Sequence, residues 1–165
     1  SWKKINSLNK YSIGIEIVNP GHEFGYKKFS ANQINSLIRL SKFLIKKYKI
    51  NKANILGHSD IAPTRKNDPG EKFPWEYLSK KNVGIWHNLD KKVLIKLRYK
   101  KCSDKMKLEF IKSLYKIGYP KKDKNKQRKS LYNTFLVKAF QRHFRQELIN
   151  GKIDQECVLI AQNLL

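Results

Sequence analysis

Apolar side chains alternate with other residues near the start of the chain, in residues 12–19. Ile13, Ile15 and Ile17 occupy every second position there, and Glu16 lies between two of them. A period of two is typical of a β-strand, in which successive side chains point to opposite faces. We therefore predict a strand over residues 12–19, with Glu16 on the face opposite the isoleucines.

A short apolar run at residues 54–57 predicts a second, buried strand that ends directly before His58. Between the two runs, Ser30 and Gln33 have the spacing of a capping box, and apolar residues at helical spacing follow them. This pattern predicts a helix over residues 31–48 that covers the sheet. The first half of the chain therefore indicates an α/β fold, with a mixed β-sheet flanked by helices.

Three further helices are predicted in the C-terminal part of the chain. Ser103 is placed to cap the first, which Gly118 ends, and Asp154 is placed to cap the last. Apolar and aromatic residues at helical spacing mark the middle helix in residues 135–144. The polar, strongly basic residues 121–130 are expected to form an exposed connecting loop.

These patterns divide the chain into two units. Residues 1–88 form the α/β domain, residues 89–101 a basic linker, and residues 102–165 a small three-helix bundle. A chain of 165 residues with 40% apolar residues can bury a core for such an arrangement. We expect a monomer.

The net charge is strongly positive, because 36 Lys and Arg residues face 13 Asp and Glu residues and give +23. Such a charge predicts attraction to polyanions, including nucleic acid, anionic lipid and acidic wall polymers. The lysines are spread along the chain without a nucleic-acid motif, so we expect no nucleic-acid partner. Cys102 and Cys157 lie far apart and are predicted to be buried free thiols. No apolar run has the length of a transmembrane helix.

The candidate chemistry lies in residues 57–70. His58 and Asp68 are residue types that bind zinc, which in hydrolases takes three protein ligands and leaves a fourth position for water. Lys66 would lie on the substrate side of the metal, where an ammonium group stabilises a developing oxyanion. Glu16 could act as the general base if the two predicted strands are neighbours. From these residues alone, a surface loop with incidental charges remains an alternative.

Three motifs resemble the zinc-dependent N-acetylmuramoyl-L-alanine amidase family: Ser-Ile-Gly-Ile-Glu-Ile-Val-Asn at residues 12–19, Gly-His-Ser-Asp-Ile-Ala-Pro-Thr-Arg-Lys-Asn-Asp-Pro-Gly at residues 57–70, and Phe-Pro-Trp at residues 73–75. The resemblance implies that His58 and Asp68 bind zinc and that Glu16 and Lys66 act in catalysis. It also implies hydrolysis of the bond between N-acetylmuramic acid and L-alanine in peptidoglycan or muropeptides. The implied compartment is the cell envelope or periplasm, ahead of the cytoplasm.

The C-terminal part is similar to the small three-helix peptidoglycan-binding domain of the larger amidases in this family, through residues 139–145 and 151–154. For Phe140, His143 and Phe144 we favour places in the helical core over a sugar-binding platform. Aromatic residues at helical spacing usually pack inside.

The resemblance also implies another zinc-binding His on a strand upstream of Glu16, but none of the fifteen residues before Glu16 is His. Three interpretations follow: a C-terminal fragment of a longer protein, a degenerate, non-catalytic peptidoglycan-binding protein, or a site in which His22 or His87 has taken that place. We favour the fragment. Asp60 and Arg65 are expected to hold the site loop in shape.

Overall fold

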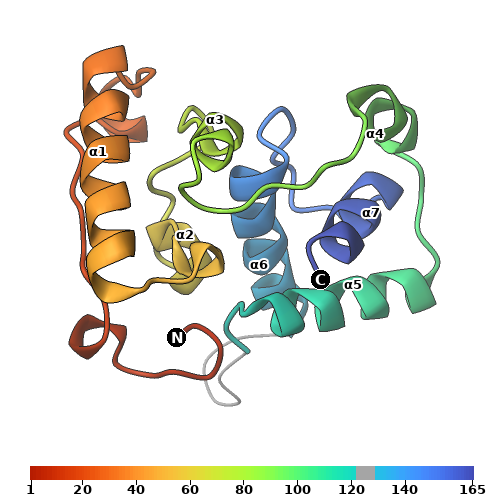
Figure 1. Ribbon diagram of the computed structural model, residues 1–165. Coiled ribbons are helices and arrows are strands. Elements are labelled where there is room, and N and C mark those ends of the chain that lie inside the picture. Colours follow the sequence, from red (N-terminus) through yellow and green to blue (C-terminus); the bar gives the residue numbers. More distant parts are fainter. Residues whose placement is uncertain (122–128) are drawn as a thin grey trace.

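The computed structural model describes residues 1–121 and 129–165, and nearly all of its regular structure is helical (Figure 1). The predicted basic loop at residues 121–130 falls mostly in the part outside these ranges. The α-helices are α1 (Ala31–Tyr48), α2 (His58–Ile61), α3 (Trp75–Lys80), α4 (Lys91–Leu97), α5 (Asp104–Ile117), α6 (Lys129–Phe144) and α7 (Gln155–Asn163). Short 3-10 turns occur at Leu8–Lys10, His22–Phe24 and Lys52–Asn54.

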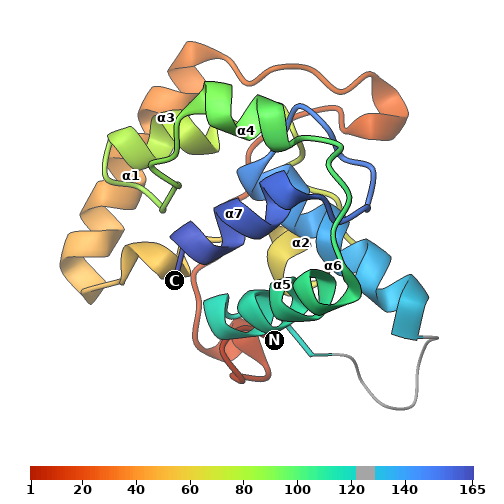
Figure 2. The same ribbon diagram turned by 90° about the vertical axis from the view of Figure 1, so that its right-hand side faces the viewer.

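Helix α6 lies near the middle of the molecule (Figure 1). Helices α2 and α3 both contact α6, while α4 and α5 both contact α7. Figure 1 shows α1 along one side of the molecule and α7 and α4 on the other, and the view in Figure 2 confirms that α5 and α7 are neighbours. The site loop, which includes α2, therefore lies between α1 and the C-terminal helices.

The predicted mixed β-sheet is wrong for the described part of the chain, which contains only the isolated bridges Trp2–Ile5 and Lys101–Asp154. Residues 12–19 run without regular structure and have no partner strand there. The second predicted strand, residues 54–57, begins in a 3-10 turn and likewise lacks a partner. A period-two pattern favours an extended backbone, but a sheet also needs a neighbouring strand to bond its N–H and C=O groups.

The predicted helices are confirmed, although α6 begins at Lys129, within the predicted loop and before the residues 135–144 that marked it. The end signals of α1, α5 and α7 are local. The amide of Gln33 donates to Ser30 Oγ (3.2 Å) while the Ser30 amide donates to Gln33 Oε1 (2.9 Å), which completes the capping box of α1. Ser103 caps α5 and Asp154 caps α7 through their side-chain oxygens. Helix α5 ends at Gly118, as predicted.

Two clusters of apolar side chains stabilise this arrangement. The larger one joins α5, α6 and α7, with Phe110, Leu114 and Phe140 almost completely buried. The smaller one lies between α1 and α3. The partly buried Trp86 packs against both clusters.

Cys102 and Cys157 are buried free thiols, as predicted. Burial raises the pKa of the Cys157 thiol to about 12. None of the helices in the described ranges combines the length and apolar character needed to cross a membrane.

Candidate metal centre

His58 and Asp68 lie side by side, although nine residues separate them in the chain. His58 opens α2, and the amide of Ser59 donates to the Asp68 carbonyl oxygen (2.9 Å), which brings the two ends of the loop together. His58 Nδ1 is then 3.1 Å from Asp68 Oδ2. The two side chains are 38% and 59% exposed, so both are accessible from solvent.

This pair fits two positions of a zinc site. An imidazole and a carboxylate are usual zinc donors, and two ligands about 2.0–2.1 Å from a tetrahedral zinc lie roughly 3.3 Å from each other. The observed separation of 3.1 Å matches that spacing. In the described ranges, however, no group of three or more His, Cys, Asp or Glu side chains could hold a metal ion.

Glu16 and Lys66 are not joined to the ligand pair by any hydrogen bond or ion pair within the described residues. The side chain of Glu16 is exposed on the unpaired segment 12–19, while the neighbouring Ile17 packs against the cluster between α1 and α3. Lys66 is half-buried, and its amide donates to the Ala62 carbonyl oxygen (3.1 Å) in the turn after α2.

Asp60 holds the loop, as the sequence suggested. Its carboxylate is 1% exposed and accepts three hydrogen bonds. The Gly57 amide donates to Oδ2 (2.8 Å), the Tyr119 hydroxyl to Oδ1 (2.7 Å), and His143 Nδ1 to Oδ2 (2.7 Å). Burial, together with the neighbouring Asp60 charge, raises the pKa of Tyr119 well above its usual value, so this hydroxyl remains a donor.

Tyr119 and His143 are the residues of this site that the sequence did not reveal. His143 is 3% exposed and lies between two aromatic rings, with centroid distances of 3.9 Å to Trp75 and 4.0 Å to Phe144. The prediction that Phe140, His143 and Phe144 belong to the core is therefore confirmed. No local signal links them to Asp60, which is distant in sequence.

The other end of the loop is fastened by Tyr26. Its hydroxyl donates to the Pro69 carbonyl oxygen (2.6 Å) and accepts from the Lys72 amide (3.0 Å). A Cβ atom on Gly70 would lie only 2.5 Å from this hydroxyl oxygen, and Gly70 has a φ of +84°. Only glycine fits this close approach next to Asp68.

The two histidines considered as substitute ligands, His22 and His87, form no hydrogen bond with His58 or Asp68 within the described residues and have other contacts. His22 Nε2 contacts Glu71 Oε2 (3.1 Å), and the His22 ring lies 4.4 Å from that of Tyr26. With Arg142, His22 and Glu71 line a shallow pocket of about 330 Å³ beside the end of the loop.

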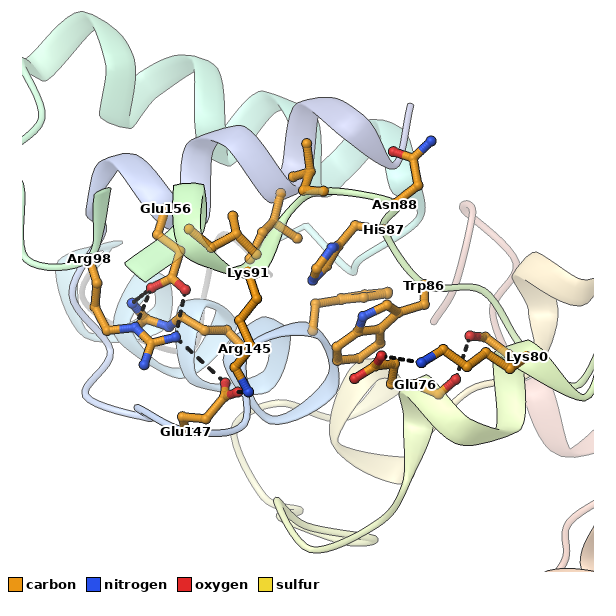
Figure 3. Close-up of a pocket in the computed structure, with 15 residues that line it drawn as sticks. Glu76, Lys80, Trp86, His87, Asn88, Lys91, Arg98, Arg145, Glu147 and Glu156 are labelled. Carbon is orange, nitrogen blue, oxygen red and sulfur yellow. Dashed lines mark hydrogen bonds and ion pairs between the residues drawn. The ribbon is translucent and has the colours of Figure 1, made fainter. Parts of the chain in front are cut away.

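His87 belongs to a different pocket, of about 480 Å³, between α3, α4, α7 and the end of α6 (Figure 3). At one end of it Arg98 forms two hydrogen bonds of 2.7 Å with Glu156. Glu76 and Lys80 lie at the opposite end, and Trp86 and His87 lie between the two ends. The charged groups at the Arg98 end neutralise each other, and neither His58 nor Asp68 lines this pocket. We therefore place the candidate metal centre at the loop.

Comparison with known proteins gives the class to which this fold and site belong. Residues 1–71 match the N-acetylmuramoyl-L-alanine amidase family. The resemblance to that family, drawn from the motifs, is thus confirmed for residues 1–71.

Individual relatives extend the similarity to the whole chain. It is 34% identical over 173 residues to N-acetylmuramoyl-L-alanine amidase AmiD of Escherichia coli (strain K12), an alignment that covers 100% of this chain and 60% of AmiD. It is 44% identical over 73 residues to 1,6-anhydro-N-acetylmuramyl-L-alanine amidase AmpD of Haemophilus influenzae, which covers 43% of this chain and 38% of that protein. The chain therefore spans less than two thirds of the relatives' length.

Solved structures of similar proteins also match nearly the whole chain. The complex of E. coli AmiD with the substrate anhydro-N-acetylmuramic acid-L-Ala-D-gamma-Glu-L-Lys superposes with a TM-score of 0.83 and 34% identity, covering 99% of this chain and 65% of AmiD. The crystal structure of AMPDH3 from Pseudomonas aeruginosa gives a TM-score of 0.82 at 32% identity, covering 99% of this chain and 65% of that one. The C-terminal helices are thus part of the shared architecture.

Proposed function

We propose that this chain belongs to a zinc-dependent peptidoglycan amidase, which hydrolyses the bond between N-acetylmuramic acid and L-alanine of the stem peptide. The observation that carries the proposal is the contact between His58 and Asp68 in a segment that matches the amidase family. AmiD and AmpD are named as amidases of this bond type, and the AmiD structure holds the substrate anhydro-N-acetylmuramic acid-L-Ala-D-gamma-Glu-L-Lys.

In this proposal His58 and Asp68 are two of the zinc ligands. Zinc, when bound, polarises a carbonyl group and lowers the pKa of a water molecule. The Glu16 carboxylate takes the proton of the attacking water and passes it to the leaving amine. The Lys66 ammonium group stabilises the negative charge that develops on the carbonyl oxygen.

We assign the parts of the chain as follows. Residues 1–88 carry the catalytic groups, residues 89–101 act as a linker, and residues 102–165 bind peptidoglycan. Support for this division comes from the family match, which lies inside the first part. The substrates are peptidoglycan or muropeptides, the protein acts as a monomer, and the compartment is the cell envelope or periplasm.

One observation favours a second candidate, a non-catalytic peptidoglycan-binding protein. The described residues offer two adjacent zinc donors, whereas a catalytic zinc site normally has three protein ligands. Such a protein would keep affinity for muropeptides and release no stem peptide.

The test is digestion of purified muropeptides by the full-length protein, with free stem peptide measured by mass spectrometry. We expect Glu16→Gln to lower the rate by about 100-fold or more, because a general base is lost. Glu23→Gln is the matched control, since Glu23 is also an exposed acid near the N-terminus, and it should retain the wild-type rate. Equal rates for Glu16→Gln and Glu23→Gln would remove Glu16 from the mechanism, and no product from wild type would favour the second candidate.

A further inference from the structure

We infer that Tyr119 and His143, which belong to the C-terminal helical part, are positioning residues for the zinc ligand His58 and act on it through Asp60. The inference rests on the proposed function in treating His58 as a ligand. It assigns the C-terminal helices a role in building the metal centre, in addition to any binding of the cell wall.

First, the side chain of Asp60 is held in one position. Its side chain is 1% exposed, and three donors converge on its two oxygens at 2.7–2.8 Å. A carboxylate cannot donate, so Nδ1 of His143 carries the hydrogen of that bond. A buried carboxylate is costly without such donors, and hydrogen bonds to charged groups are stronger than those between neutral groups.

The second step is that the two donors outside the loop are fixed in place. The Tyr119 ring is 2% exposed and packs edge-on against Trp2 at a centroid distance of 5.2 Å. The His143 ring is stacked between Trp75 and Phe144, with interplanar angles of 16° and 12°. Neither ring can turn without disturbing the core, so the positions of both donors are set by the C-terminal helices and their packing.

The third step links Asp60 to the ligand pair. Helix α2 contains only four residues, His58 to Ile61, and a helix this short is not stable through its own hydrogen bonds. The bond from the Gly57 amide to Asp60 Oδ2 closes the turn that contains His58. The amide of Ser59, two residues after Gly57, donates to the Asp68 carbonyl oxygen, so the same turn also determines where the second ligand lies.

A purely structural role makes a different prediction from a positioning role. If these contacts only stabilised the fold, their loss would lower protection from exchange throughout the molecule. If they position His58, their loss loosens residues 57–60 more than the rest and weakens zinc binding.

The experiment compares Tyr119→Phe with Tyr132→Phe in the full-length protein. Each substitution removes one hydroxyl from a buried tyrosine of the C-terminal part, but the Tyr132 hydroxyl donates to the Pro120 carbonyl oxygen (2.6 Å) and not to Asp60. Hydrogen exchange of the Gly57 and Ser59 amides, measured by NMR on metal-free protein, is compared with exchange in α1. Zinc affinity is measured separately by titration.

We expect Tyr119→Phe to speed exchange at Gly57 and Ser59 about tenfold relative to α1, and to weaken zinc binding by a similar factor. Tyr132→Phe should change neither the exchange at Gly57 and Ser59 relative to α1 nor the affinity for zinc. His143→Phe, which keeps a ring between Trp75 and Phe144 but loses the donor, should act like Tyr119→Phe. If exchange in both Tyr119→Phe and His143→Phe changes uniformly or not at all, or if zinc affinity is unchanged, the inference is overturned. Exchange is read without metal, so a wild-type protein that binds no zinc would refute the proposed function, while the exchange ratio would still show whether the loop depends on Tyr119.

Discussion

The half-buried His87 is expected to make the stability of this molecule depend on pH. Its Nδ1 atom is buried and has no hydrogen-bond partner among the described residues. Burial lowers the pKa of His87 below its usual value of 6.5, although nearby Glu76, Glu147 and Glu156 partly oppose the shift. The unfolded chain therefore takes up a proton at a pH where the native protein still resists it, and stability falls as the pH drops below 6.5.

We expect the free energy of unfolding to be lower at about pH 5.5 than at about pH 7.5, with part of that loss due to His87. His87→Gln should reduce the pH dependence, because glutamine does not titrate. His22→Gln, at an exposed histidine paired with Glu71, is the control that should leave the contribution of His87 in place. Urea denaturation at both pH values measures the difference, and an identical pH dependence for wild type and His87→Gln would contradict this reading.

At the scale of elements, the ends of helices are the best specified features of the chain. Gly118 ends α5 with a φ of +137°, and the Lys3 amide donates to its carbonyl oxygen (2.9 Å). A Cβ atom at this position would lie 2.6 Å from Trp2 Cε2. Gly118 thus ends the helix, and its lack of a side chain allows Trp2 of the N-terminal segment to pack closely against it.

We expect Gly118→Ala to lower the free energy of unfolding by about 2 kcal/mol or more, because it combines strain at positive φ with overpacking against Trp2. Gly14→Ala is the matched control, since a Cβ there has nothing within 4 Å and φ is not positive. Thermal or chemical denaturation of the two variants provides the comparison. Equal stability for both would mean that Trp2 does not pack as described.

Helix ends could be predicted from the sequence, whereas the pairing of strands could not. Helix ends could be predicted because caps such as Ser30 and Asp154 act on residues three positions away. The sheet could not, since strand pairing depends on a distant partner that residues 12–19 do not have in the described chain. His58, Asp68 and Asp60 were found from one short motif, whereas Tyr119 and His143 lie 59 and 83 positions from Asp60 and carry no local signal.

At the scale of the whole molecule, the site depends on contacts that cross the chain. Helices α2 and α3 both pack on α6, and the buried Asp60 joins the site loop to the C-terminal part. The large positive charge is spread over the chain. It favours encounter with anionic polymers but does not determine which reaction is catalysed. We therefore expect the chemistry of the proposed amidase to depend on His58 and Asp68 in the loop.

The most direct test of the zinc-dependent amidase is the metal content of the full-length protein, measured by mass spectrometry after equilibration with micromolar zinc and dialysis. We expect about one zinc ion per chain in wild type and in Asp104→Asn, a control at an exposed aspartate of α5. Asp68→Asn should lose most of the zinc, because the amide is a poor ligand in place of the carboxylate. A wild-type protein without zinc, or an Asp68→Asn variant that retains it fully, would contradict the account.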